Sequence, residues 1–432
     1  MTNRIKVLRI AALAAAAAVA LAGCGGGGGG GTSNADGKKV MNAMFIGGTA
    51  DKALIDVVRE VTDEFNETNE FNVEMRIETY ENEQYKTKLA SLMASNSQPD
   101  VFFTWSSGYL KPFVAGNKVL DLTPFLDADA EWKGRFNDGV FGPVTFDDKI
   151  YAVPHGAAVA VMYYNTGIFA EHGLEVPTTW PEFVDVVTTL KAAGVTPLSA
   201  PVKDAWIAGQ LLQQIGNAEA GIGLFDETVA LTAKWNDPRY VAAGEKLKEL
   251  QTLGAFPDGY LGMTNDEGRD LFTSGKTAMY YMGSWDMSVL SDSAVAGDID
   301  VFNIPPVTPG ENVAVGDVDL AYAVGANTKN ADAAAAYIKL FSDTTAQEGF
   351  AYDASYLIST NTELDEAKLS PLFIKINALQ HDLTAVTPWF DRVFGAGEGV
   401  EFNNAAQAII AGQDPTPRLD ELQTFAEANA ER

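Results

Sequence analysis

Hydrophobic and polar positions follow two different spacings along the chain from residue 39 onward. In segment 71–79 apolar residues occupy alternate positions, which is the pattern of a β-strand with one buried face. In segment 54–65 they recur every three or four residues, which is the pattern of an amphipathic helix. The predicted order for the first part of the chain is strand 40–47, helix 54–65, strand 71–79, helix 84–94 and strand 100–104.

The same alternation resumes after Tyr151. Thr179 is followed three residues later by Glu182, which is the capping-box pattern of a helix start. Strands are predicted at 158–164, 195–200 and 277–282, and helices at 179–192, 205–215, 237–253, 331–341, 371–379, 401–411 and 418–426. Strands that alternate with helices predict the α/β class, with a parallel sheet that carries helices on both faces.

Three predicted strands of the first half end in short segments that are suited to a binding site. These segments are 47–49 (Gly-Gly-Thr), 80–82 (Tyr-Glu-Asn) and 105–107 (Trp-Ser-Ser). Ligands of open α/β sheets bind at the carboxyl ends of the strands. We therefore expect the three segments to face one cleft.

Residues 1–23 have the layout of a secretory signal peptide. Three basic residues precede an apolar run at 10–21, and small residues follow directly before Cys24. A retained membrane-spanning helix is the alternative, but it needs about 20 apolar residues, and this run is shorter and leads into glycines. The sequence Leu-Ala-Gly-Cys at 21–24 resembles the bacterial lipobox, whose cysteine is acylated and becomes the new N-terminus. Cys24 is the only cysteine of the chain, so it forms no internal disulfide, and we expect it to be lipidated.

Seven consecutive glycines at 25–31 begin a polar segment that reaches Lys38. A segment of this composition buries no apolar surface and behaves as a flexible tether. For residues 24–38 the root-mean-square reach is about 20 Å. The expected product is a folded body that a lipidated tether holds close to a membrane.

The length of 432 residues and the charge balance narrow the possible functions. Single cores stop growing near ~250–300 residues, so two lobes or domains are expected. The formal net charge is −28, and removal of residues 1–23 would take away three positive charges and no negative one. Such an acidic chain disfavours nucleic-acid partners, which attract Lys and Arg, and direct docking on anionic lipid. It favours a soluble monomer.

Motifs spread over residues 40–425 resemble a known family. They are 98–101 (Gln-Pro-Asp-Val), 150–154 (Ile-Tyr-Ala-Val-Pro), 163–169 (Tyr-Tyr-Asn-Thr-Gly-Ile-Phe), 177–183 (Pro-Thr-Thr-Trp-Pro-Glu-Phe), 196–198 (Thr-Pro-Leu) and 272–285 (Phe-Thr-Ser-Gly-Lys-Thr-Ala-Met-Tyr-Tyr-Met-Gly-Ser-Trp). In the order and spacing of these motifs the chain resembles the extracellular solute-binding lipoproteins of bacterial ABC transporters. The resemblance is to family 1, the maltose-binding-protein-like group, which carries oligosaccharides.

This resemblance implies the periplasmic-binding-protein-like fold: two α/β lobes, each a sheet flanked by helices, are joined by hinge segments and close on a ligand like a clamp. It also implies binding without catalysis, no cofactor, delivery of the ligand to permease subunits, and a lipid-anchored position on the extracytoplasmic face of the cell membrane. Carried over to this sequence, the first lobe comprises 39–153 and 317–352, the second comprises 157–306 and 360–432, and the hinges lie near 153–157, 307–316 and 351–359.

Tryptophans at predicted strand ends are the first candidates for a sugar site. A sugar offers apolar C–H faces and dense hydroxyl groups, so its site combines aromatic rings with a few fixed polar groups. Trp285 follows a predicted strand where the family commonly stacks a ring on its ligand, and Trp105 and Trp206 also follow predicted strands. Core packing is the alternative for each of them. Trp389 is a fourth candidate, although its segment could equally seal the second lobe. We interpret the other three tryptophans as structural: Trp132, Trp180 and Trp235.

Four ionisable residues are candidates for contact with ligand hydroxyl groups. Asp319 enters a predicted strand beside a hinge, with Asp317 as its rival for the same role. Glu81 follows a strand end, where a solvated loop charge is the alternative. His155 lies in a predicted hinge segment, although a lone histidine is more often satisfied by backbone groups.

Other chemistries have weaker support. Three scattered histidines and one cysteine are poor material for a His- or Cys-based metal site. Segment 275–277 (Gly-Lys-Thr) ends like a phosphate-binding loop, but Asp270 stands where that loop requires its first glycine. A lipid-anchored glycoside hydrolase stays open as an alternative, because two of the 58 acidic residues could converge in the fold. A binding protein that serves a membrane sensor is the other alternative.

Overall fold

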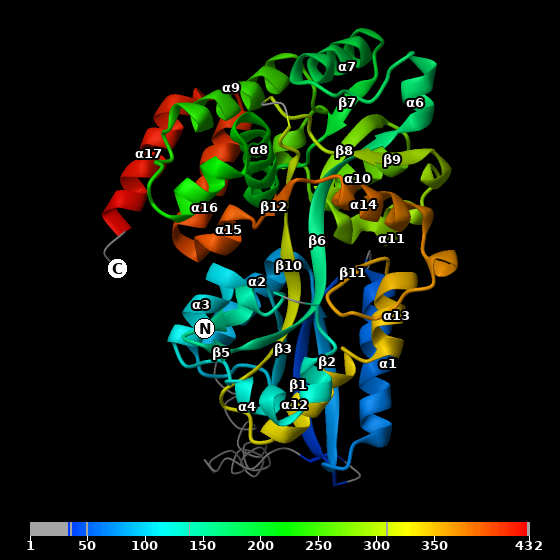
Figure 1. Ribbon diagram of the computed structural model, residues 1–432, viewed down its shortest axis with the longest axis vertical. Helices are drawn as coiled ribbons and strands as arrows, with labels where there is room; N and C mark the ends of the chain where they lie inside the picture. Colours follow the sequence, from blue (N-terminus) through cyan, green and yellow to red (C-terminus); the bar gives the residue numbers. More distant parts are fainter. Residues whose placement is uncertain (1–32, 35–36, 49–50, 138, 308–309, 430–432) are drawn as a thin grey trace, which may run out of the picture.

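The computed structural model describes residues 33–34, 37–48, 51–137, 139–307 and 310–429 (Figure 1). The side chains of Asp319 and Ala396 lie outside this description as well. Residues 1–32, which hold the predicted signal peptide, Cys24 and the run of glycines, also lie outside the described residues.

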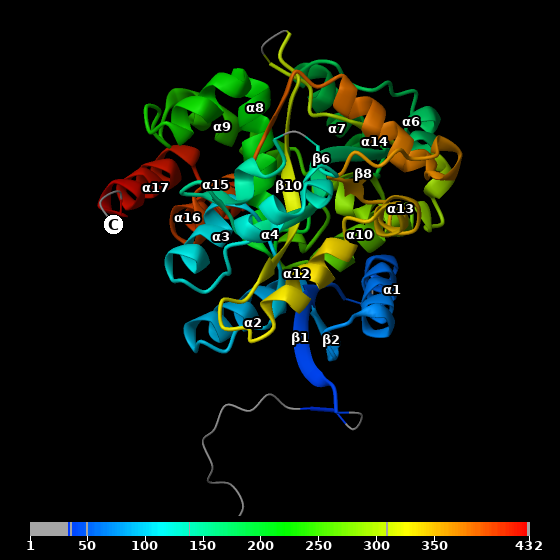
Figure 2. The ribbon, with the colours of Figure 1, turned by 60° about the horizontal axis from the view of Figure 1, so that its bottom comes forward.

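The first lobe begins with the predicted order of strands and helices. Strand β1 (Lys39–Ile46) pairs in parallel with β2 (Val73–Tyr80) and with β3 (Val101–Thr104). Helices α1 (Lys52–Thr68) and α2 (Asn82–Ala94) connect these strands and lie on either side of them (Figure 2). The apolar stripe of α1 is buried, as its periodicity predicts, so the strand–helix order predicted for residues 40–104 is confirmed.

Two long strands connect the lobes and make the sheet mixed, not parallel throughout as predicted. Strands β6 (Ala152–Asn165) and β10 (Val313–Val324) run from one lobe into the other and pair antiparallel (Figure 1). The sheet order is β2-β1-β3-β10-β6-β8-β7. Strand β6 continues without a break through residues 153–157. The antiparallel pairs arise because the chain returns between lobes on strands, and no local pattern marks such a return.

The second lobe is built on β7 (Thr196–Ser199), β8 (Thr277–Gly283) and the end of β6, with β9 (Ile299–Phe302) beside β6. Helix α7 (Trp180–Ala192) starts at the predicted capping box of Thr179 and Glu182, in which both reciprocal hydrogen bonds are present. Helix α8 (Ala205–Val229) extends well beyond the predicted end at residue 215.

The other helices surround this framework. They are α3 (Ser107–Ala115), α4 (Thr123–Ala128), α5 (Ala130–Lys133), α6 (Thr166–Glu171), α9 (Pro238–Thr252), α10 (Asn265–Thr273), α11 (Met287–Ser291), α12 (Ala331–Leu340), α13 (Thr344–Tyr352), α14 (Pro371–His381), α15 (Phe390–Val393), α16 (Gly395–Ile410) and α17 (Pro415–Asn429). The remaining strands are the short β4 (Thr145–Phe146), β5 (Lys149–Ile150), β11 (Leu357–Ile358) and β12 (Ala385–Thr387). In the part of the chain that the structure describes, no helix is both long and apolar enough to span a bilayer.

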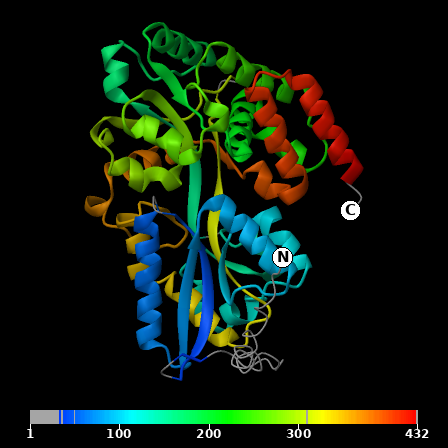
Figure 3. The same ribbon diagram turned by 180° about the vertical axis from the view of Figure 1, so that it is seen from behind.

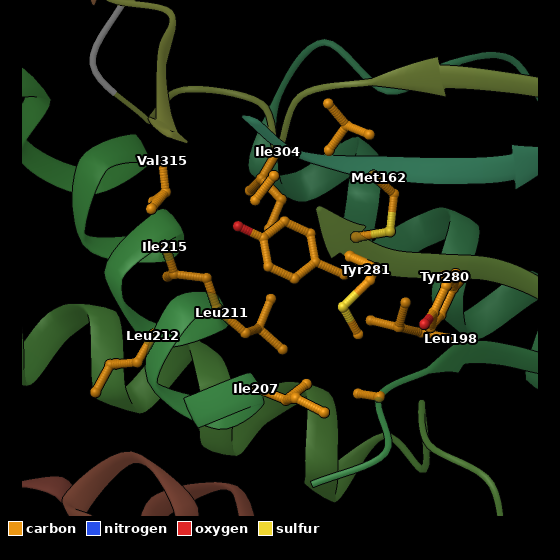
Figure 4. Close-up of a cluster of buried hydrophobic side chains, with 14 of the residues drawn as sticks. Met162, Leu198, Ile207, Leu211, Leu212, Ile215, Tyr280, Tyr281, Ile304 and Val315 are labelled. Atoms are coloured by element: carbon orange, nitrogen blue, oxygen red, sulfur yellow. The ribbon is translucent and has the colours of Figure 1, made fainter. Parts of the chain in front are cut away.

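Each lobe has its own hydrophobic core. In the second lobe Tyr281 of β8 packs among Met162, Leu211 and Ile304 (Figure 4). The first-lobe core contains Phe45 and the aromatic residues around it. Away from the cores, helix α3 of the first lobe contacts α15 and α16 of the second, which is visible from behind the molecule (Figure 3). The protein is therefore a two-lobed clamp, whose lobes share two strands and a contact between helices.

Candidate functional site

Residues of both lobes line a cleft of ≈ 500 Å³. This volume lies within the range of about 300–1,000 Å³ that is typical of ligand pockets. The lining residues of the first lobe include Gly47, Asp51, Glu81, Glu83 and Trp105, and those of the second include Lys203, Asp204, Trp206, Asp266, Arg269, Trp285, Asp286 and Arg392.

The first-lobe wall of the cleft is formed at the carboxyl ends of β1, β2 and β3. Gly47, Glu81 and Trp105 follow these three strands, so the structure brings together the three segments that were expected to face one cleft. Glu81 lies directly against Gly48, where an added Cβ would stand 1.6 Å from Glu81 Oε1. Only glycine leaves room for this carboxylate at position 48.

Asp51 precedes α1 and connects the two walls electrostatically. The backbone N–H of Gly48 donates to Asp51 Oδ2 at 2.8 Å. Burial raises the pKa of Asp51, while the Gly48 N–H and Arg269 of the opposite lobe act to lower it. Asp51 and Arg269 thus place an acidic and a basic side chain on opposite walls of the cleft.

The side chain of Trp105 is almost completely buried, so little of its ring is open to a ligand. Its side chain is 3% exposed, and it packs edge-to-face against Phe103 and Tyr109. The guanidinium carbon of Arg392 lies 4.6 Å from the centre of the Trp105 ring. Because Arg392 belongs to the second lobe, this cation–π contact joins the two walls and covers part of the Trp105 ring.

Trp206 and Trp285 supply the half-buried aromatic surface of the second-lobe wall. Their ring centres are 6.0 Å apart, and the ring planes are inclined at 59°. The Trp285 ring lies against Gly283 at the end of β8, where an added Cβ would stand 2.1 Å from the ring. The glycine therefore allows the ring to fold back over the strand end and to face the cleft.

An ionic network around the buried pair Arg269–Asp286 also lines the cleft. Arg269 on α10 donates to Asp286 Oδ1 at 3.2 Å and to Asp266 Oδ1 at 2.5 Å. The hydroxyl of Tyr280 donates to Asp286 Oδ2 at 2.8 Å. Burial raises the pKa of Asp286, and Arg269 and the Tyr280 hydroxyl oppose this shift. The network presents fixed donors and acceptors at the floor of the cleft.

Trp389 and His155 do not belong to the lining of this cleft. Trp389 is buried and packs against Trp285, with ring centres 6.0 Å apart, at the edge of a second, smaller cavity. His155 lies in the first-lobe core, stacked on Tyr322 at 4.1 Å between ring centres. Burial lowers its pKa to about 3, so the imidazole is neutral there. Its aromatic neighbours make His155 a core residue, and it is not part of the proposed site.

Asp317, one of the two predicted aspartates near the hinge, is also absent from the lining. Asp317 Oδ2 accepts a hydrogen bond from the Ser106 hydroxyl at 3.3 Å. Asp317 Oδ1 accepts one from the backbone N–H of Val318 at 2.7 Å. Asp317 therefore helps to hold the loop after β3. The side chain of Asp319 lies outside the described residues.

Several charged residues of the cleft were not predicted. Lys203 and Asp204 lie between the end of β7 and the start of α8, so the rule applied to Trp206 would also have found them. Arg269 and Arg392 lie on helices, at positions that no strand end marks. They reach the cleft through the packing of α10 and α15, which the local sequence does not reveal. Within the described ranges, no group of three or more His, Cys, Asp or Glu side chains is placed to hold a metal ion.

Comparison with known proteins gives consistent matches. A family model described as bacterial extracellular solute-binding protein matches residues 51–348. The chain is similar to the multiple sugar-binding protein of Streptococcus mutans, with 28% identity over 231 residues, which are 52% of this chain and 55% of that protein. It is also similar to the diacetylchitobiose binding protein DasA of Streptomyces coelicolor, with 27% identity over 325 residues, 71% and 72% of the two chains.

A solved structure is similar to this chain over most of its length. It comes from work on xylan utilization by the thermophilic bacterium Caldanaerobius polysaccharolyticus, and it superposes with a TM-score of 0.84 at 28% sequence identity. The superposition covers 89% of this chain and 99% of that one. The curated relatives are matched over a shorter part of their length, 55% for the Streptococcus mutans protein and 59% for an ABC transporter extracellular-binding protein of Pyrococcus horikoshii.

Proposed function

We propose that this chain, which belongs to the bacterial extracellular solute-binding protein family, binds a carbohydrate between its lobes and delivers it to the permease of an ABC importer. The family is one of binding proteins, and the proposed role is binding without catalysis. The names of two relatives support a sugar as the ligand, since one is a multiple sugar-binding protein and the other a diacetylchitobiose binding protein.

The observation that carries the proposal is the make-up of the cleft. Trp206 and Trp285 offer aromatic surface from the second lobe, and Glu81 and Asp51 offer carboxylates from the first. Aromatic rings pack on the C–H faces of a sugar, and carboxylates accept hydrogen bonds from its hydroxyl groups. A ligand that uses both sets of groups bridges the two lobes.

The charges in the cleft favour a neutral sugar over an acidic one. The lining contains six acidic residues and three basic ones. An anionic ligand would meet an excess of negative charge in a partly desolvated site, which weakens its binding. We therefore infer that the ligand is a neutral oligosaccharide, or one that carries amino groups, and not a uronic-acid or phosphorylated sugar.

Closure of the clamp is the proposed mechanism. Contacts that form only when both lobes touch the ligand provide the difference in affinity between open and closed states. The hinges are proposed near 153–157, 307–316 and 351–359. The pairing of β10 with β6 shifts register between Asp317 and Leu320, beside this region, which supports a bend there. The closed form would then dock on the permease as a monomer.

The place of the protein in the cell is also a proposal. Acylation of Cys24 would anchor the folded body, through the glycine-rich tether, to the extracytoplasmic face of the bacterial membrane. A protein held there captures solute outside the cell and meets its permease in the same membrane. Mass spectrometry of the protein from its native membrane tests this: a mass that corresponds to acylated Cys24 is expected, and an unmodified N-terminal segment contradicts it.

A thermal-shift screen tests the ligand class. The panel contains xylotriose, maltotriose, cellotriose and diacetylchitobiose, with galacturonic acid trimer as the anionic comparison. A ligand at about a hundred times its Kd stabilises the folded state by ~2.7 kcal/mol. We expect stabilisation by a neutral sugar, its loss in Trp285→Ala, and recovery of the sugar uncleaved by chromatography.

Two other outcomes of the screen would support a different function or contradict the carbohydrate proposal. A sugar that stabilises the protein and is then recovered cleaved supports the lipid-anchored glycoside hydrolase. No stabilisation by any sugar of the panel contradicts the carbohydrate proposal, while membership of the solute-binding family stands. A binding protein that serves a membrane sensor would bind sugar equally well, so transport of radiolabelled sugar into cells that lack this protein separates the two roles.

A further inference from the structure

A small second cavity, here called the inner cavity, lies directly behind the second-lobe wall of the cleft. It shares Trp206, Trp285 and Arg392 with the cleft lining. Trp389 closes it on the inner side and packs against Trp285. Trp285 therefore borders both the cleft and the inner cavity.

Four buried polar atoms belong to residues that line the inner cavity. They are Nε1 of Trp206, Nε1 of Trp389, Oε1 of Gln210 and Oδ1 of Asp391, and none of them has a hydrogen-bond partner among the described residues. Gln210 and Trp389 are 2% and 5% exposed. Buried polar atoms nearly always have a hydrogen-bond partner, so four such atoms around one cavity indicate that the cavity receives a polar group.

The other atoms of these side chains are held in place. Asn403 donates to Asp391 Oδ2 at 3.2 Å, and Gln210 Nε2 lies 3.7 Å from the sulfur of Met282. Asn403 approaches closely because residue 209 is glycine, where an added Cβ would stand 1.8 Å from Asn403 Oδ1. The acceptor oxygens of Gln210 and Asp391 are thus positioned by contacts that do not use them.

The small volume of the inner cavity limits the size of the group that can bind in it. The space open to the centre of a water molecule is ≈ 10 Å³, which is about enough for one oxygen-sized group. A hydroxyl group is both a donor and an acceptor. The two indole N–H groups and the two acceptor oxygens offer it partners of both kinds.

We propose that the inner cavity is a subsite for one hydroxyl group, or one hydroxymethyl arm, of the carbohydrate bound in the cleft. The ligand group enters past Trp285, accepts a hydrogen bond from the indole N–H of Trp206 or Trp389, and donates to Gln210 Oε1 or Asp391 Oδ1. This proposal rests on the proposed function. It adds a specificity element, because a ligand without that hydroxyl leaves the buried groups unpaired.

The test compares two buried tryptophans, one beside the inner cavity and one in the first-lobe core. Trp389→Phe removes the indole N–H and keeps an aromatic ring. Trp132→Phe is the matched control, since Trp132 is also buried with an Nε1 that has no hydrogen-bond partner among the described residues, but it lies in the first-lobe core and lines neither cavity. Titration calorimetry of the full chain uses the four neutral oligosaccharides of the panel, and calorimetric unfolding reports Tm.

For the sugar that binds wild type, we expect Trp389→Phe to raise Kd by about 10-fold and Trp132→Phe to leave Kd within about 2-fold. Gln210→Met, which removes the acceptor oxygen at similar volume, should weaken binding in the same way. The indole N–H resonance of Trp389, assigned by its loss in Trp389→Phe, should shift when the sugar saturates the protein.

Unchanged Kd in Trp389→Phe and Gln210→Met, with changes in Tm alone, overturns the subsite and makes the inner cavity the place of a structural water. Failure of all four sugars to bind wild type is a different result: it overturns the carbohydrate proposal, and the subsite with it.

Discussion

The two lobes differ in where they place their most deeply buried Arg, Asp or His side chains. The second lobe buries a charged pair, Arg269 and Asp286, and places it at the floor of the cleft. In the first lobe a neutral histidine, His155, is buried among aromatic rings away from the cleft. A buried ion pair rarely stabilises a fold compared with apolar residues. The position of the charged pair at the cleft therefore indicates a role in binding more than in folding.

The two lobes also differ in how much tryptophan surface they expose beside the cleft. Trp206 and Trp285 of the second lobe remain half-buried beside the cleft, whereas Trp105 of the first lobe is buried beneath Arg392. The second lobe thus presents a surface that is ready for a ligand. We expect it to supply most of the binding free energy, while the first lobe completes the site on closure.

Among the proposed substitutions, removal of Arg269 should cause the largest loss, and the loss is in the free energy of unfolding. Arg269→Met leaves the Asp286 carboxyl group buried without its cation, and the loss of one partner of a buried pair costs about 3–5 kcal/mol of the free energy of unfolding. Urea unfolding measures this loss. The matched control is Arg76→Met, which breaks a solvent-screened surface pair with Glu74 and should change the free energy of unfolding much less. Equal losses in the two variants would contradict a special role for the buried pair.

Truncation of Trp285 comes next and tests which lobe dominates binding. Trp285→Ala should cost at least ~2 kcal/mol of binding free energy, about a 30-fold rise in Kd. Glu81→Gln, which removes a charge from the exposed first-lobe loop, should change Kd by less than about 10-fold. Titration calorimetry with the sugar found in the panel measures both. A larger effect of Glu81→Gln would reverse the assignment of the lobes.

His155 should make the stability of the first lobe sensitive to acid. Its pKa is about 3 in the folded chain and about 6.5 in an unfolded one. The unfolded chain therefore takes up the proton first, and the free energy of unfolding falls as the pH drops from about 6.5 toward 3. At pH 5.5 the expected loss relative to pH 7.5 is roughly 1.4 kcal/mol.

The variant His155→Phe keeps the ring stacking on Tyr322 and should lack this component of the pH dependence. Urea unfolding at pH 7.5 and 5.5 gives the difference for each protein. An equal pH dependence in wild type and His155→Phe would show that His155 is protonated in the folded chain.

The carboxyl ends of β1, β2 and β3 show how far local pattern predicts a site. Glu81 and Trp105 were expected to face one cleft because parallel strands end at a common edge, and both line it. The expectation for His155 did not use such a rule, and the structure places that residue in a core. Whether the lining residues contact a ligand stays a prediction that the binding experiments test.

The sequence by itself determined the strand–helix order of residues 40–104, the capping box of α7 and the family, because these depend on periodicity and on motifs within short segments. Only the tertiary structure decided that β6 and β10 run through both lobes, that Arg269 and Arg392 reach the cleft, and that four buried polar atoms surround one small cavity. These features depend on contacts between residues far apart in the chain, and local pattern carries no information about such contacts.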